Sequence, residues 1–200
     1  MAPLHADEES GDAPIRAFVA IGLDDAARRA VAQIIATLRG GAAGDAVRWV
    51  PPENLHVTLC FLGNAAVAQL GILVSSLRRS ATALRPFSMR LGAMTVFPSP
   101  QRPRVVSCEV GPEATLARLA QVVARAASRA GFALEARPFR PHLTLGRFRE
   151  RKHGSVTASV TSVDQSVCVD EIVLYRSQLR RTGALHIPLE RIALGGSNHP

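Results

Sequence analysis

The chain has 200 residues, of which 47% are hydrophobic, and it carries 24 Lys and Arg against 16 Asp and Glu. Its length suffices for one domain with a stable interior, and its hydrophobic content and mean hydropathy of +0.12 exclude a wholly disordered chain. Residues 1–14 hold four acids and no base, so the other 186 residues carry 24 bases against 12 acids, a net charge of +12. Such a body is typical of a protein with a polyanionic partner, although a coding bias towards Ala and Arg would produce the same composition.

The first half of the chain predicts two strand–helix units behind an acidic tail. Residues 1–14 are polar and are expected to be disordered. Apolar spacing, turn residues and capping residues then predict a strand over 16–23, a helix capped by Asp24 up to about Leu38, a turn over 49–52, a strand over 55–62, and a helix capped by Asn64 up to about Arg79.

In the second half, several strands follow one another without a helix between them. The predicted elements are strands over 87–97 and 104–110, a helix opened by Pro112 and ended by Gly131, and strands over 142–148, near 168–176 and over 185–194, before a tail over 195–200. Paired strands favour an α+β fold with antiparallel sheets over a doubly wound parallel sheet.

Several protein classes are excluded at this level. The N-terminus lacks a basic start followed by an apolar core, so no secretory signal is expected. Residues 57–77 are uncharged and about long enough to cross a bilayer, at roughly 20 residues, but polar residues and glycines interrupt them. Cys60, Cys108 and Cys168 are odd in number and lack a CxxC spacing, which indicates thiols of a cytoplasmic protein rather than disulfides or a zinc site.

A short motif occurs once in each half of the chain. The two copies are His56-Val57-Thr58-Leu59 and His142-Leu143-Thr144-Leu145. Because residues i and i+2 of a strand point to one face, each copy places an imidazole and a hydroxyl side by side, opposite apolar residues that can enter a core. Phe61 continues the apolar face of the first copy and is expected in the core.

The pair of motifs suits phosphodiester chemistry, which needs a base for the nucleophile and an acid for the leaving oxygen. The pKa of histidine, about 6.5, makes both protonation states accessible near neutrality. The threonine hydroxyls can donate hydrogen bonds to phosphate oxygens, and no carboxylate or cysteine cluster calls for a metal. One His-x-Thr on a strand is usually incidental; two copies beside proline-marked loops favour catalysis.

In these residues the sequence resembles the 2H phosphoesterase superfamily, and within it the RNA 2′,3′-cyclic phosphodiesterase family, also called 2′-5′ RNA ligases. The similarity covers roughly residues 16–194. Its segments are Arg16–Ile21, Asn54–Gly63, Arg102–Val106, Arg137–Arg147 and Leu174–Ser177.

The resemblance implies one bilobal domain over 15–194, in which two similar lobes with antiparallel sheets and outer helices are related by a pseudo-twofold around a central cleft. It implies metal-independent opening of RNA 2′,3′-cyclic phosphate ends to a 2′-phosphate, without a cofactor. His56 would be the proton donor and His142 the proton acceptor that activates water, while Thr58 and Thr144 would hold the phosphate. The implied partner is RNA with such an end, tRNA fragments included, and the expected state is a monomer without an obligatory protein partner or a membrane.

Other residues are weaker candidates. Arg147 breaks the alternation of His142 and Thr144, and a bulge at Gly146 would return it to the phosphate. Phe139 and Phe18 are candidates for base stacking, with core packing favoured for Phe18. The other bases near the second motif are expected to contact flanking phosphates or to solvate a loop; they are Arg137, Arg140, Arg149, Arg151 and Lys152.

Two departures from the family pattern bear on base recognition. Ser107-Cys108 stands where the family often has an aromatic residue, and His186 where it often has a tyrosine. Three functions remain open: the RNA phosphodiesterase, with the reverse 2′-5′ ligation; a non-catalytic RNA-binding module; and a small-molecule cyclic phosphodiesterase of the same chemistry.

Overall fold

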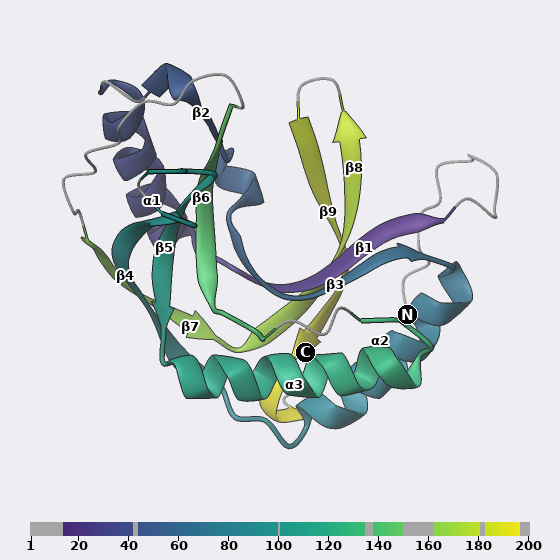
Figure 1. Cartoon of the computed structure of the whole chain (residues 1–200). Coiled ribbons are helices and arrows are strands. Elements are labelled where there is room, and N and C mark those ends of the chain that lie inside the picture. Colours follow the sequence, from purple (N-terminus) through teal and green to yellow (C-terminus); the bar gives the residue numbers. More distant parts are fainter. Residues whose placement is uncertain are drawn as a thin grey trace.

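A computed structural model describes residues 14–41, 44–99, 101–134, 138–149, 162–180 and 183–196. Residues 1–13 of the acidic tail predicted over 1–14 and the last residues of the predicted C-terminal tail lie outside these ranges. The protein has an α+β fold built on two antiparallel sheets (Figure 1).

The first sheet, which we call sheet A, has four strands in the order β3-β1-β8-β9. The strands are β3 (His56–Ala65), β1 (Ile15–Gly22), β8 (Glu171–Arg180) and β9 (Gly183–Ala193). Its central strand β1 is buried over Ala17–Ile21, which explains the nearly continuous apolar run of that segment. The first motif therefore lies on an edge strand, next to the most buried strand of the sheet.

The second sheet, sheet B, has five strands in the order β2-β6-β5-β4-β7. The strands are β2 (Val47–Trp49), β6 (His142–Phe148), β5 (Val105–Gly111), β4 (Phe87–Phe97) and β7 (Ser162–Val169). The second motif opens β6, whose Leu143 and Leu145 are fully buried. The strands β3 and β6 contact each other, so the two sheets meet at the two motifs.

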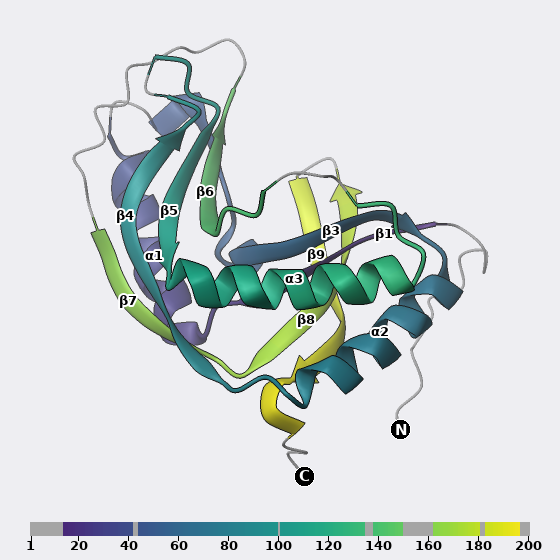
Figure 2. The ribbon, with the colours of Figure 1, turned by 60° about the horizontal axis from the view of Figure 1, so that its bottom comes forward.

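Three helices lie on the outside of the sheets (Figures 1 and 2). Helix α1 (Asp25–Arg39) packs against sheet B, while α2 (Val67–Ala81) and α3 (Glu113–Arg129) pack against each other and against strands of sheet A. Short 3-10 turns complete the described chain; they are η1 (Gly44–Ala46), η2 (Pro52–Asn54) and η3 (Leu194–Gly196). The α+β class, the antiparallel sheets and the outer helices agree with the sequence prediction.

Some boundaries differ from the prediction. Asn64 does not cap a helix, because β3 continues to pair with β1 through Ala65; α2 begins at Val67, and Gln69 accepts a hydrogen bond from the Ala66 N–H at 3.2 Å. Residues 47–49 form β2, so Trp49 belongs to a strand and not to the turn predicted over 49–52.

The segment predicted as one strand near 168–176 contains two strands. They are β7 and β8, which are separated only by Asp170. Strand β7 alternates buried valines with polar residues at the edge of sheet B. At the other end of the domain, η3 continues one turn into the predicted tail.

The uncharged segment over 57–77 forms most of β3 and α2. In the described ranges, no helix has the length and apolar character needed to cross a membrane. The segment is therefore uncharged because β3 and α2 each contribute a buried face to the core.

Candidate active site

His56 stands at the first position of β3, held at both ring nitrogens. Its Nδ1 is 2.7 Å from the backbone carbonyl oxygen of Asn54, which can only accept, so Nδ1 carries the proton. Its Nε2 is 3.0 Å from the hydroxyl of Thr58, two residues along the strand. In the neutral ring, Nε2 is therefore an acceptor directed to the same side as the threonine hydroxyl. The predicted pairing of imidazole and hydroxyl on one face is confirmed.

His142 repeats this arrangement on β6. Its Nδ1 is 2.8 Å from the backbone carbonyl oxygen of Arg140, again two residues earlier, so Nε2 is the nitrogen left for a ligand. The side chain is exposed and Thr144 is half-buried. His142 lies close enough to His56 for its charge to lower the pKa of His56. The two motifs thus present two equivalent Nε2 atoms to a shared region.

Aromatic and imidazole rings surround His56. The Phe18 ring lies 4.8 Å from the His56 ring and 5.2 Å from the Tyr175 ring, on which it stacks. The His186 ring meets both His56 and Phe18 edge-on, at 5.0 and 4.9 Å. Phe18 is only 4% exposed, which confirms the favoured core packing and leaves no free face for stacking on a base. The Phe18 ring packs against the His56 ring, because β1 is an inner strand of sheet A and pairs with β3.

This packing changes the acidity of His56. Burial lowers the pKa of His56 from 6.5 to about 4; the Asn54 carbonyl opposes the shift, and the neighbouring His186 and His142 add to it. At neutral pH the unliganded ring is therefore neutral, with its Nε2 lone pair directed to Thr58. A phosphate anion at Nε2 would favour the protonated form and reverse part of this shift.

His186 brings a third imidazole to the site from β9. Its Nδ1 is buried without a hydrogen-bond partner among the described residues, and burial lowers the pKa of His186. In the sequence, His186 stands at a position where the family often has a tyrosine, a departure that bears on base recognition. The structure places it against the proposed proton donor.

Asn54 is a site residue that the sequence reasoning missed. It is buried, its side-chain amide donates to the Ala184 carbonyl at 2.6 Å, and its Oδ1 accepts from the His186 N–H at 3.3 Å. Its own carbonyl accepts the Nδ1 proton of His56. Asn54 therefore fixes the orientation of His56 and joins β9 to the start of β3. A polar residue two positions before the histidine was the only sequence signal.

Two irregularities in β3 change which residues share the face of His56. In the pairing with β1, Thr58 is opposite Ala20 and Phe61 is opposite Phe18, so Leu59 and Leu62 are the extra residues of two bulges. Paired residues share a face, so Phe61 lies on the same face as Thr58. Its ring is 6.2 Å from Phe18, and the residue is 69% exposed. The expectation that Phe61 enters the core is wrong, because the bulge at Leu59 reverses the alternation.

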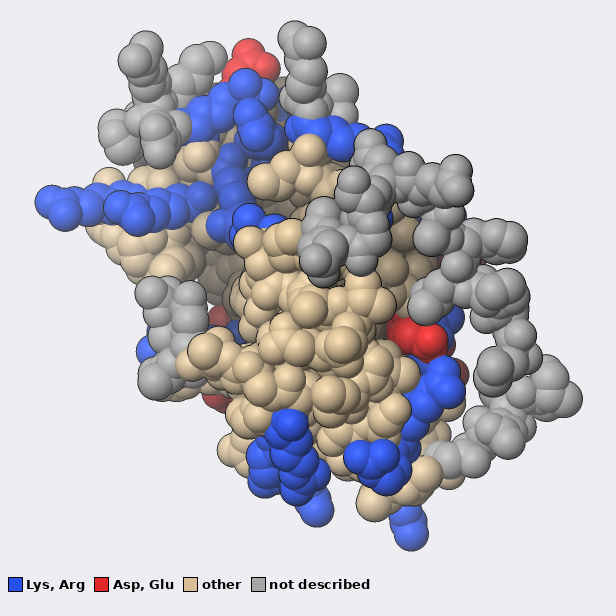
Figure 3. Space-filling model, turned by 90° about the vertical axis from the view of Figure 1, so that its right-hand side faces the viewer, with Lys and Arg blue, Asp and Glu red and all other residues tan. Residues whose placement is uncertain are grey.

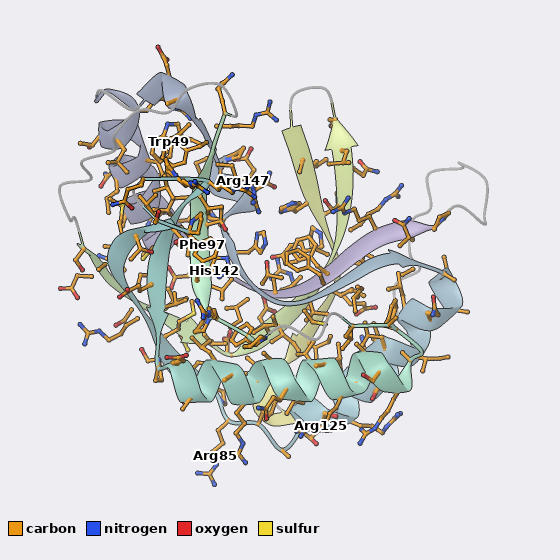
Figure 4. All side chains as sticks on the ribbon, in the orientation of Figure 1. Trp49, Arg85, Phe97, Arg125, His142 and Arg147 are labelled. Carbon is orange, nitrogen blue, oxygen red and sulfur yellow. The ribbon has the colours of Figure 1, made fainter. Side chains whose placement is uncertain are left out.

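A third bulge lies in the second motif. Val106 pairs with Gly146 and Ser107 with Thr144, so Leu145 is the extra residue and the alternation changes before Arg147. The sequence predicted such an irregularity here. It places Arg147 on the same face of the sheet as His142 and Thr144. Arg147 is exposed and lies along β6 with His142 (Figure 4).

Gly146 also allows β2 to approach β6 closely. A Cβ atom at this position would lie 2.5 Å from Val47 Cγ1 and 3.1 Å from Trp49 Cε3. Trp49 pairs with Gly146, and its Nε1 donates to the Gly44 carbonyl at 3.2 Å. The glycine thus holds the edge strand against the strand that carries His142.

The remaining candidates take various positions. Phe139 is half-buried and packs against the core, which limits its use for stacking. Ser107 is buried opposite Thr144, and its hydroxyl lies 3.1 Å from that of Thr95. Among the basic residues near the second motif, Arg140 and Arg149 are exposed, and three lie outside the described ranges: Arg137, Arg151 and Lys152.

Cys60 and Cys108 are not activated nucleophiles. Burial raises the pKa of both Cys60 and Cys108 to about 11, so both remain protonated at neutral pH. Within the described ranges, no group of three or more His, Cys, Asp or Glu side chains is arranged to hold a metal ion. The polar chemistry at this site therefore consists of imidazoles, hydroxyls and guanidinium groups.

Comparison with known proteins agrees with this geometry. The family model described as LigT like Phosphoesterase matches residues 21–107 and 110–186. An RNA 2′,3′-cyclic phosphodiesterase of Methanothermobacter thermautotrophicus is 32% identical over 88% of this chain and 97% of its own. One of Bacillus subtilis is 41% identical, over 50% of this chain and 55% of its own. The crystal structure of E. coli LigT complexed with 3′-AMP has a TM-score of 0.75 at 31% identity, covering 90% of this chain and 98% of that one. On the matched family model and the two histidine motifs, the chain belongs to the LigT-like phosphoesterase family.

Proposed function

We propose that this protein opens RNA 2′,3′-cyclic phosphate ends by hydrolysis and leaves a 2′-phosphate. The observation that carries the proposal is the matching Nδ1 hydrogen bond of the two histidines. In both, Nδ1 donates to a backbone carbonyl two residues earlier, while Nε2 faces the Thr58 hydroxyl in His56 and is left for a ligand in His142. An imidazole with a bare Nε2 can act as the base, and one whose Nε2 has taken up a proton can act as the acid that the reaction requires. The names of the relatives supply the substrate class.

In the proposed mechanism, His142 takes a proton from water as the water attacks phosphorus. His56 gives a proton to O3′ as the P–O3′ bond breaks, so the phosphate stays on O2′. Thr58 and Thr144 hold the non-bridging oxygens, and Arg147 neutralises part of their charge. Each proton transfer contributes about 10²–10⁴-fold to the rate.

The low pKa of His56 imposes an order on these steps. The empty site favours the neutral ring, since burial disfavours its charge. The anionic cyclic phosphate supplies the negative charge that lets His56 take up a proton. Substrate binding and protonation of His56 are therefore coupled, and the acid forms when the leaving oxygen is present.

The test is incubation of an RNA that ends in a 2′,3′-cyclic phosphate with the protein in the presence of EDTA, followed by identification of the product end. The proposal is supported if a 2′-phosphate accumulates in the presence of EDTA at the same rate as in its absence. A 3′-phosphate would contradict the assigned leaving group, and full inhibition by EDTA would contradict a mechanism that uses two histidines alone. We also propose that the protein is cytoplasmic, where reducing conditions keep its three cysteines as thiols.

A further inference from the structure

An open groove of about 440 Å³ lies on sheet A beyond the ring cluster at His56. It is bounded by the beginning of β1 and the end of β8, which diverge from each other in Figure 1. Its lining includes three arginines and several neutral polar groups: Arg16, Arg176, Arg180, Asn64, Ser177 and Gln178. Among the described residues, no acidic side chain lines it.

The groove is continuous with the proposed reaction site. Phe18 and Tyr175 stack on each other beside His56. Arg16 lies two residues before Phe18 on β1, and Ser177 two residues after Tyr175 on β8, so each shares the face of its aromatic neighbour. Arg176 pairs with Ala17, so Arg176 and Arg180 lie on the opposite face of β8 and line the groove from that side. Two residues along a strand span about 7 Å, so Arg16 and Ser177 lie about 7 Å along their strands from Phe18 and Tyr175. The groove therefore begins next to the rings that surround His56.

The charge of the groove is available to a ligand. The ion pairs among the described residues use other arginines, namely Arg28, Arg78, Arg90 and Arg191. Among the described residues, Arg180 makes one side-chain hydrogen bond, a long one of 3.4 Å to the Gln178 amide oxygen. Figure 3 shows this side of the molecule, where Lys and Arg gather in the upper part and few acids interrupt them. An anionic ligand would therefore meet guanidinium groups that make no ion pair with the described residues.

Phe61 lies between the reaction site and this groove. It follows Thr58 on the His56 face, and Asn64, which lines the groove, is the next residue of β3 on that face because Asn64 pairs with Arg16. An aromatic ring that is 69% exposed beside a basic groove is the arrangement by which proteins bind single strands without base-specific contacts.

We propose that this surface is a binding track for single-stranded RNA, in which the base of the terminal nucleotide stacks on Phe61 and the preceding phosphates bind Arg16, Arg176 and Arg180. The proposal rests on the proposed function, since a cyclic phosphate ends an RNA at its 3′ side and the rest of the strand can leave the site in one direction only. The track makes an oligonucleotide a better substrate than a mononucleotide.

The first experiment compares kcat/KM for a short oligonucleotide with a 2′,3′-cyclic phosphate end and for the corresponding mononucleoside cyclic phosphate. In the double variant Arg16→Gln/Arg180→Gln, the ratio of kcat/KM for the oligonucleotide to kcat/KM for the mononucleotide falls about 20-fold at 0.1 M salt. The slope of log kcat/KM against log salt concentration for the oligonucleotide becomes shallower by about 1.4, because each single-strand phosphate contact contributes about 0.7. The matched control is Arg125→Gln, which removes a charge from α3 on the outer side of the molecule (Figure 4) and keeps both quantities.

A ratio and a salt slope unchanged in the double variant would overturn the arginine track while leaving the proposed function intact. If the unaltered protein opens neither substrate, the proposed function itself fails. For the stacking step, Phe61→Leu lowers kcat/KM for both substrates by about 5- to 100-fold, the range for one base–aromatic stack. Unchanged turnover of both substrates by Phe61→Leu would overturn that step.

Discussion

The imidazole of His56 donates its Nδ1 proton to the backbone carbonyl of Asn54, 2.7 Å away. Through its side-chain amide, the same asparagine binds Ala184 and His186 on β9. One buried residue therefore sets the tautomer of the proposed acid and positions the third imidazole against it. Asn54 acts through these neighbours, so we regard it as a positioning residue.

Replacement of Asn54 by Ala tests this role. It leaves the Ala184 carbonyl and the His186 N–H without their partner, which costs about 1–3 kcal/mol of unfolding free energy. The displaced rings lower kcat roughly tenfold or more, with a smaller change in KM. Urea unfolding and steady-state kinetics measure the two effects. Leu77→Val, which loosens the core under α2, is the control: a kcat loss of the same size there would assign the effect to stability alone.

The pH dependence of stability tests the burial of His56. Its pKa is about 4 in the folded protein and 6.5 in an unfolded chain, so between these values the unfolded state binds the proton and the folded state does not. The stability due to neutral His56 is full above about pH 6.5 and is lost as the pH falls through about 4. At pH 4.5 the loss is about 2–3 kcal/mol relative to pH 7.

Urea unfolding at pH 7 and pH 4.5 measures that loss as a difference in unfolding free energy. In His56→Gln this difference should be smaller by the contribution of His56. His186 shifts in the same direction, so His186→Gln in the same assay gives its separate share. NMR titration of the His56 ring gives the pKa directly, and addition of a nucleoside 2′-phosphate raises it. An unperturbed midpoint near 6.5 in the free protein would contradict the proposed coupling.

Gly146 gives a purely steric prediction. In Gly146→Ala the new methyl group lies 2.5 Å from Val47 Cγ1 and 3.2 Å from the Arg48 carbonyl oxygen, so β2 must move away from β6. Overpacking of this kind costs about 1–3 kcal/mol. The control is Gly71→Ala in α2, where nothing lies within 4 Å of the added Cβ and the helix gains about 0.5–1 kcal/mol. Thermal unfolding of the two variants should therefore shift in opposite directions.

The roles of the two histidines can be separated by the leaving group. His56→Ala and His142→Ala each lower kcat about 10²–10⁴-fold on the natural substrate. A substrate with sulfur in place of O3′ releases a thiolate, which departs without a proton from His56. Activity on this substrate is therefore restored in His56→Ala and stays low in His142→Ala. The opposite pattern of rescue would exchange the two assignments.

Much of the fold and part of the site follow from local patterns. The sequence predicted strands over 142–148 and 87–97, which are the observed bounds of β6 and β4, and Asp24 accepts the Ala27 N–H at 2.8 Å as the expected helix cap. Because i and i+2 share a strand face by geometry alone, the pairing of His56 with Thr58 needed no tertiary information. The irregularity before Arg147 was visible in Gly146.

The fate of Phe61 depended on strand pairing. Its side of the sheet is set by the bulge at Leu59, and that bulge exists only in the register of β3 against β1. The same pairing buries Phe18 in the middle of sheet A and carries β3 past Asn64, which overrides the capping preference of that residue. Local alternation counts residues along one strand and contains no information about its partner.

By itself, then, the sequence determined an α+β chain with two histidine motifs suited to phosphodiester chemistry, since these features depend on residue types at spacings of two to four. Only the tertiary structure decided that Asn54 binds a strand 130 residues further along, that His186 packs against His56, and that an arginine groove continues the site. These relationships join β1, β3, β8 and β9, which become neighbours only when sheet A forms. The burial that lowers the pKa of His56 arises in the same assembly, because desolvation depends on what surrounds the ring and not on its place in the chain.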